Sequence, residues 1–182
     1  MKIGMLTNNP VGELPLLKSI GFKSIEVLCW PGDYCDPKNG TDADERIKKM
    51  KETLDEEGIE ISAIGYYPNH LDPESADSEI GPKHLINLFK VAENLGVETV
   101  CTFAGRDPKK SISDNIPEFK KVFEPIAKQA QDHGVRIAFE NCPMMYNSLM
   151  LGGNIAISPR AWDMMFDAVP FDNLGLEYDP SH

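Results

Sequence analysis

The chain has 182 residues, of which 41% are hydrophobic and 26% charged, as in a globular protein long enough to bury a core within one domain. Its formal charge of −11 at pH 7 disfavours a nucleic-acid partner, because such binding depends on phosphate neutralisation by Lys and Arg. No stretch approaches the roughly 18 consecutive apolar residues of a membrane-spanning helix, and the N-terminal MKIGMLT lacks the apolar region of a signal peptide.

Two periodicities alternate along the chain. Short apolar runs predict strands in six places: residues 2–7, 24–30, 60–67, 98–105, 135–142 and 174–179. Between them, five segments have helical apolar spacing: 12–22, 42–58, 81–96, 111–134 and 158–170. In the second of these, Ile47, Met50 and Leu54 form one apolar stripe, and Gly58 is placed to end the helix in the left-handed conformation.

This regular alternation predicts a parallel sheet with right-handed crossovers and helices outside. No G-x-G-x-x-G follows the first strand, which weakens a dinucleotide-binding fold and favours a (β/α) barrel. A closed barrel has eight strands and about 250 residues. We therefore expect an α/β fold, an incomplete TIM-type barrel of six parallel strands, as a single domain over residues 1–182. Its first and last strands would be exposed edges, which favours homo-oligomers.

The four cysteines are Cys29, Cys35, Cys101 and Cys142, and no two of them have C-x-x-C spacing. Most lie in strand-like segments. We expect buried thiols in a reducing cytoplasm rather than a zinc site or a disulfide framework.

Strand alternation places two carboxylates at one end of the sheet. Ile137 and Phe139 share the apolar face of their strand, so Glu140 faces the barrel axis, and the same alternation turns Asp179 inward. Both acids lie at the carboxyl ends of neighbouring strands, where barrels carry their chemistry.

Two such acids repel each other unless a proton or a cation lies between them. His182 can fold back over the same mouth, and two carboxylates with an imidazole suit a divalent metal such as Mn²⁺, Mg²⁺, Co²⁺ or Zn²⁺. The alternative is structural: Asp179 caps a loop, Glu140 pairs with an arginine and His182 is a frayed terminus.

The segments FENCPM, GGNIAISPRAWDMMF and NLGLEYDPSH, together with TFAGRDP, resemble the sugar phosphate isomerase/epimerase family of xylose-isomerase-like TIM barrels. The combination of ENCPM with DPSH is more specific than either motif alone. The resemblance implies that Glu140 and Asp179 are metal ligands, that Glu140 is also catalytic, and that His182 is a catalytic or substrate-binding residue. The family's last two ligands, a His after strand seven and a Glu after strand eight, have no position in this sequence.

The function implied by the resemblance is metal-dependent isomerisation or epimerisation of a small sugar or sugar phosphate through an enediolate, which a divalent ion stabilises. A dehydratase on the same scaffold stays open. Because two of the four ligands have no counterpart, we expect this chain to bind its divalent metal weakly or not at all.

Three further residues are candidate substrate contacts, each with a structural alternative. His70 could reach the mouth or be a solvated loop residue, and Arg106 could hold a sugar oxygen or phosphate or pair with Asp107. Trp30 could stack on a sugar or pack in the core. Glu26 also faces inward, with at most an indirect role.

The other histidines and one long loop complete the candidates. His84 and His133 lie in helical segments and are expected at the surface. The glycine-containing segment 144–154 is a candidate lid.

Two alternative functions stay open. An endonuclease-IV-like abasic-site nuclease shares the barrel and the Glu and Asp-Pro-x-His elements, but it needs a histidine after the fourth strand, where this chain has Phe103 and Ala104. The second alternative is a barrel fragment without catalytic activity.

Overall fold

The computed structural model describes residues 2–145 and 152–182. Within these residues, six parallel strands form one sheet in the order β1-β2-β3-β4-β5-β6, so each strand pairs with the next along the chain. The strands are β1 (Gly4–Thr7), β2 (Ser24–Leu28), β3 (Glu60–Gly65), β4 (Thr99–Thr102), β5 (Arg136–Glu140) and β6 (Leu174–Glu177). The helices are α1 (Leu14–Ile20), α2 (Ala43–Glu56), α3 (Asp77–Leu95), α4 (Ile112–Asp132) and α5 (Pro159–Ala168). The predicted alternation is confirmed.

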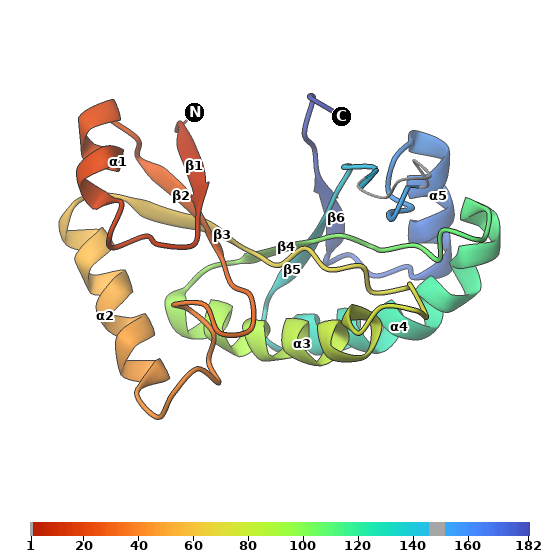
Figure 1. The fold of residues 1–182 in the computed structure, drawn as a ribbon, viewed down its shortest axis with the longest axis horizontal. Helices are drawn as coiled ribbons and strands as arrows, with labels where there is room; N and C mark the ends of the chain where they lie inside the picture. The colour runs from red at the N-terminus through yellow and green to blue at the C-terminus, as the bar shows by residue number, and fades with distance from the viewer. Residues whose placement is uncertain (1, 146–151) are drawn as a thin grey trace.

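The sheet curves into an open trough, the shape of a barrel that is not closed (Figure 1). β1 and β2 form one wall and β6 the other, while α3 and α4 run along the outside of β3, β4 and β5. β1 and β6 are therefore the two edges of the described sheet. This arrangement confirms the predicted TIM-barrel-type fold with helices outside.

Helix α2 shows why the sequence pattern predicted this layer arrangement. Its stripe of Ile47, Met50 and Leu54 is at most 4% exposed, because these residues lie on the helix face that packs on the sheet. Gly58 adopts the expected left-handed conformation with φ of 69°. Asp42 stands at the N-cap position without a side-chain cap bond; its carboxylate pairs with Arg46 at 3.2 Å instead.

Aromatic packing fixes the orientation of β5. Phe139 is fully buried, and its ring lies 5.0 Å from Phe123 and 5.6 Å from Phe119, both on α4. Burial of each such side chain contributes about 2–3 kcal/mol. Because Ile137 and Phe139 are fixed on the helix side, Glu140 is turned to the inner face of the trough.

The expectation of four thiols is wrong for one pair. Cys29 and Cys35 form a disulfide, with their Cα atoms 5.4 Å apart. The turn that follows β2 brings them together: the Trp30 backbone N–H donates to the Asp33 carboxylate, and the Asp33 N–H donates to the Trp30 carbonyl. Cys101 and Cys142 are buried, as expected.

His84 does not lie at the surface as predicted. It is 4% exposed on the inner face of α3, and its Nε2 lies 2.8 Å from the carbonyl oxygen of Cys29. The polar imidazole is tolerated there because this carbonyl satisfies it. His133 is half-exposed, and its Nδ1 lies 2.7 Å from Glu93.

The described helices include none with the length and hydropathy required to cross a membrane.

Candidate functional site

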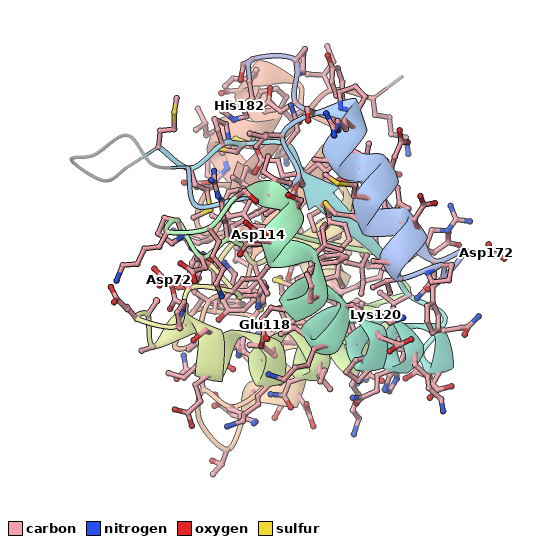
Figure 2. The ribbon with its side chains drawn as sticks, turned by 90° about the vertical axis from the view of Figure 1, so that its right-hand side faces the viewer. Asp72, Asp114, Glu118, Lys120, Asp172 and His182 are labelled. Carbon is pink, nitrogen blue, oxygen red and sulfur yellow. A yellow bond between two sulfur atoms is a disulfide. The ribbon has the colours of Figure 1, made fainter. Side chains whose placement is uncertain are left out.

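The structure brings three sequence-predicted residues together at the carboxyl end of β5 and β6. His182 Nε2 lies 3.4 Å from Glu140 Oε1 and 3.5 Å from Asp179 Oδ2, so the imidazole stands between the two carboxylates. Side-chain exposure is 17% for Glu140, 29% for His182 and 38% for Asp179. The site is therefore partly shielded on the Glu140 side and open to solvent at its rim, where Figure 2 shows His182.

Two asparagines hold the loops around this group. The Asn141 side chain and the Asp179 backbone exchange two hydrogen bonds, at 2.7 and 2.9 Å, which join the ends of β5 and β6. Asn154, which is fully buried, donates to the carbonyl oxygens of Glu140 and Cys142 at 2.9 and 2.8 Å. The backbone that carries Glu140 is thus fixed from both sides.

The two carboxylates have opposite electrostatic settings. Burial raises the pKa of Glu140, the nearby Glu177 raises it further, and His182 opposes both effects. The pKa of Asp179 is lowered, chiefly by the hydrogen bond from the Ser181 backbone N–H and also by His182. Glu140 therefore holds a proton more readily than Asp179 does, which suits it to accept one from a substrate.

Among the described residues, two groups have ligand atoms that all lie within 4.8 Å of one another: Glu140 with Cys142 and His182, and Glu26 with Cys101 and Glu177. The first group contains two predicted site residues and adds Cys142. Its oxygen, nitrogen and sulfur donors fit a divalent transition metal. Asp179 lies outside this group and is connected to it through His182.

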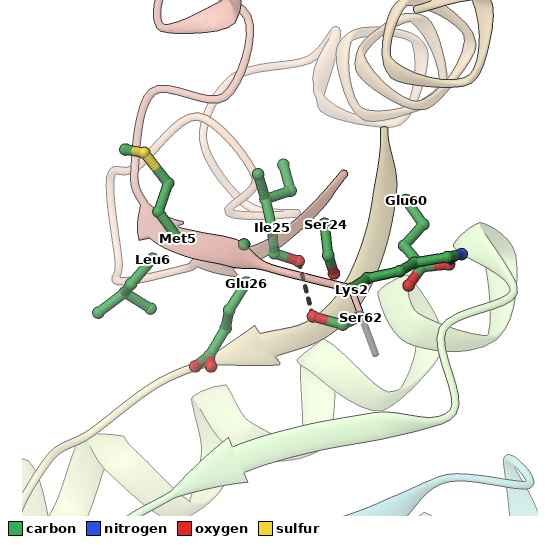
Figure 3. A pocket seen from close by; sticks show the side chains of 9 residues that line it. Lys2, Met5, Leu6, Ser24, Ile25, Glu26, Glu60 and Ser62 are labelled. Carbon is green, nitrogen blue, oxygen red and sulfur yellow. Dashed lines mark hydrogen bonds and ion pairs between the residues drawn. The ribbon is translucent and has the colours of Figure 1, made fainter. Parts of the chain in front are cut away.

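A second polar cluster lies on the inner face of the trough. The Tyr67 hydroxyl contacts Glu26 Oε1 and lies 2.9 Å from Glu177 Oε2. Glu177 is the register partner of Glu140 across β5 and β6, so the two clusters adjoin. Figure 3 shows Glu26 projecting from β2 on the side opposite to Ile25, at one end of a cavity of about 470 Å³ beside β1.

The three candidate substrate contacts do not join the carboxylate group. His70 is 1% exposed, and its Nε2 lies 3.0 Å from Thr102 Oγ1, on the helix side of the sheet. Trp30 packs edge-on against Tyr66 at 4.9 Å between ring centres, the core role that was its alternative.

Arg106 stays on the rim. Its guanidinium donates twice to the Lys110 carbonyl oxygen, at 2.8 and 3.2 Å, and Asp107 pairs with Lys110 rather than with Arg106. Arg106 lines a surface cavity of about 450 Å³ together with Ser158 and Arg160. Of the candidate lid, residues 146–151 lie outside the described residues.

Sequence reasoning missed the residues that hold the site. Asn141, Asn154 and Tyr67 make their contacts through hydrogen bonds between segments that are far apart in the chain. Only Glu177 had a readable signal, because it alternates with Asp179 on the inner face of the sixth strand.

The family model described as xylose isomerase-like TIM barrel matches residues 14–182. The chain belongs to this family.

Solved structures with the same fold include sugar epimerases. A D-tagatose 3-epimerase-like protein matches with a TM-score of 0.73 and 21% identity, over 100% of this chain and 66% of its own. An L-ribulose 3-epimerase matches with a TM-score of 0.71 and 19% identity, over 98% of this chain and 60% of its own. The probable 3-DHS dehydratase involved in petrobactin synthesis from Bacillus anthracis matches with a TM-score of 0.71 and 18% identity, over 98% and 63%.

These identities show the fold. The chain spans less than two thirds of the length of each of these three proteins. A comparison with curated proteins gives no match.

The family assignment bears on the nuclease alternative. After β4, where that alternative needs a histidine, Phe103 and Ala104 are buried at 6% and 0% exposure, and residues 103–111 contain no histidine. The described geometry gives the nuclease no specific support, whereas the family supports sugar isomerase and epimerase chemistry.

Proposed function

We propose that this chain is part of an enzyme that moves a proton at a carbon next to a carbonyl group of a small sugar or sugar phosphate, with help from a divalent cation. The observation that carries the proposal is the position of His182 Nε2 between Glu140 and Asp179 at the carboxyl end of β5 and β6. Active sites of (β/α) barrels lie at this end. Isomerisation or epimerisation of the sugar would follow from where the proton returns.

The donor set supports a cation. Glu140 and His182 offer one oxygen and one nitrogen within 4.8 Å of each other and of the Cys142 sulfur, and Asp179 lies beside His182. A divalent ion bound there would polarise the carbonyl and hydroxyl oxygens of the sugar and so stabilise the enediolate. Mn²⁺, Mg²⁺, Co²⁺ and Zn²⁺ all fit such a site in principle.

The residues of the chain have separate parts in this proposal. Glu140 would accept the proton, since partial burial and Glu177 raise its pKa. His182 would donate a hydrogen bond to a sugar oxygen, and Asp179 would fix the imidazole. The second acid or base is proposed to come from outside these six strands, as the family resemblance implies, so the complete activity is proposed for the whole protein.

A paramagnetic titration tests the cation site even where affinity is weak. On adding Mn²⁺ at millimolar concentration, we expect NMR signals of Glu140, Cys142 and His182 to broaden first. Glu140→Gln should remove this preference, whereas Glu52→Gln, on the exposed face of α2, should leave it unchanged. Broadening spread evenly over the surface carboxylates would contradict the proposal.

Proton transfer itself is tested by solvent exchange. The chain, loaded with Mn²⁺ in deuterated water, is incubated with a panel of ketoses, aldoses and their phosphates. We expect deuterium at the carbon next to the carbonyl, and we expect its loss in Glu140→Gln but not in Glu52→Gln. The same readout covers the dehydratase reaction, because that also begins by proton removal next to a carbonyl.

We also propose self-association through the sheet edges. Leu6 on β1 is 50% exposed and Tyr178, just after β6, is 68% exposed, so apolar side chains accompany unpaired strand edges. Leu6→Lys should reduce association in light scattering, whereas Leu16→Lys on α1, with similar exposure of 48%, should not. A monomeric wild-type chain would contradict this. The cytoplasmic location stays a prediction from the sequence.

A further inference from the structure

Three glutamates share the inner face of the trough. Glu140 and Glu177 are register partners on adjacent strands, and like charges at directly opposite positions destabilise a sheet. Glu26 reaches the same place from β2, since both Glu26 and Glu177 contact the Tyr67 hydroxyl. A further device is needed to hold these acids together.

The hydrogen count at Tyr67 supplies that device. A phenol has one O–H donor, so Tyr67 can donate to only one of the two carboxyl groups that it contacts. The other contact is a hydrogen bond only if that carboxyl group carries a proton and donates to the phenol oxygen. One of the two acids is therefore neutral.

Glu26 is the acid whose surroundings favour the neutral form. Its carboxyl group lies against Gly65 on β3, where a Cβ atom would stand 2.3 Å from Glu26 Oε1, so the absence of a side chain at Gly65 makes room for it. Burial, Glu177 and Glu140 raise the pKa of Glu26 to about 8, whereas the Tyr67 hydrogen bond acts in the opposite direction.

The groups that face Glu26 come from several elements. They are Tyr67 after β3, Cys101 on β4, Glu140 on β5, Glu177 on β6, and Lys2 in the shared cavity. Lys2 pairs with Glu60 and not with Glu26. Burial raises the pKa of the Cys101 thiol as well, so Cys101 supplies no charge that could neutralise an ionised Glu26.

We propose that Glu26 is held as a neutral carboxylic acid and that, with Tyr67, it is a positioning residue that binds Glu177 and leaves Glu140 to His182. Glu26 donates to the Tyr67 oxygen, and Tyr67 donates to the Glu177 carboxylate. Each of the two opposed acids on β5 and β6 then has its own partner: Tyr67 for Glu177 and His182 for Glu140. The consequence for catalysis rests on the proposed function; the protonation of Glu26 does not.

The pH dependence of unfolding tests the protonation. Between the ordinary pKa of 4.5 and the folded value of about 8, the folded chain holds a proton on Glu26 that the unfolded chain has lost. Stability from this group is therefore complete below the ordinary value and is lost as pH rises. Relative to Glu26→Gln, the unfolding equilibrium constant of the wild type should rise by close to about tenfold per pH unit across this window.

Each outcome of this experiment decides the matter. The amide of Glu26→Gln resembles the neutral acid in shape and can donate to Tyr67, so the variant should fold at pH 7. Parallel pH profiles for wild type and Glu26→Gln, or a variant that fails to fold at pH 7, would overturn the proposal. Infrared difference spectra should also show the carbonyl stretch of a protonated carboxylic acid at neutral pH in the wild type and its absence in Glu26→Gln.

Tyr67→Phe tests the positioning. Without the hydroxyl, Glu177 loses its partner and can compete for a cation, so Mn²⁺-induced broadening should extend from Glu140 to Glu177. The double variant Tyr67→Phe/Glu177→Gln should restore the wild-type pattern. A packing role alone would lower stability without such rescue, and that result would overturn the positioning. If wild type shows no Mn²⁺ preference at Glu140, the proposed function fails, while the pH profiles still decide the state of Glu26.

Discussion

The side chain of Asn141 and the backbone of Asp179 form a reciprocal pair of hydrogen bonds. The Asp179 N–H donates to Asn141 Oδ1 at 2.7 Å, and Asn141 Nδ2 donates to the Asp179 carbonyl oxygen at 2.9 Å. Asp179 lies two residues beyond the end of β6, so these bonds continue the β5–β6 pairing past the ladder. They fix the distance between Glu140 and Asp179.

Replacing Asn141 by Ala should destabilise the fold by about 1–3 kcal/mol, because two hydrogen bonds are lost and the Asp179 backbone groups lose their partners. Denaturant unfolding measures the loss. Asn94→Ala, on the exposed face of α3, is the control and should change stability by less than about 0.5 kcal/mol. Equal effects of the two substitutions would show that the reciprocal pair has no special role.

Gly65→Ala should be costly and Gly175→Ala should not, although both glycines lie in strands of the same sheet. A Cβ atom at Gly65 would stand 2.3 Å from Glu26 Oε1 and 2.7 Å from the Tyr67 ring, whereas nothing lies within 4 Å of a Cβ atom at Gly175. Overpacking of this kind costs about 1–3 kcal/mol. Thermal unfolding of both variants checks the contrast, and a tolerant Gly65 would mean that the Glu26–Tyr67 cluster can shift freely.

His70 should make the fold sensitive to acid. Complete burial lowers its pKa to about 3, from an ordinary 6.5. Between these values the unfolded chain binds a proton that the folded chain does not, so stability rises with pH across this range and is lost as pH falls. His70→Gln, which cannot titrate, should show a flatter decline in the free energy of unfolding between about pH 6.5 and 4. Identical slopes would contradict the burial of this imidazole.

Calorimetric titration with Mn²⁺ should give weak binding for this chain alone. The described group supplies Glu140, Cys142 and His182, with Asp179 beside them, and its rim is open to solvent. Too few fixed ligands leave the coordination sphere poorly defined. A tight one-to-one isotherm would refute this expectation, and its loss in Glu140→Gln would then place the tight site at the group described above.

Periodicity in the sequence determined the fold of this protein. Alternation along β5 placed Ile137 and Phe139 in the core and Glu140 on the inner face, because neighbouring residues of a strand must point to opposite sides. The position of Glu140 and Asp179 at one end of the sheet followed from parallel strands alone. Alternation placed Tyr178 on the helix side, yet it is exposed, because it lies at the edge strand of the sheet.

Only the tertiary structure decided which polar groups meet. Tyr67 joins Glu26 on β2 to Glu177 on β6, 151 residues apart in the chain, through the curvature of the whole sheet. The pairing of Cys29 with Cys35 and the burial of His84 against the Cys29 carbonyl likewise depend on how one turn packs on α3. Local pattern determines which side a residue faces, but hydrogen-bond partners depend on distances between segments, and those are set only once the sheet has curved.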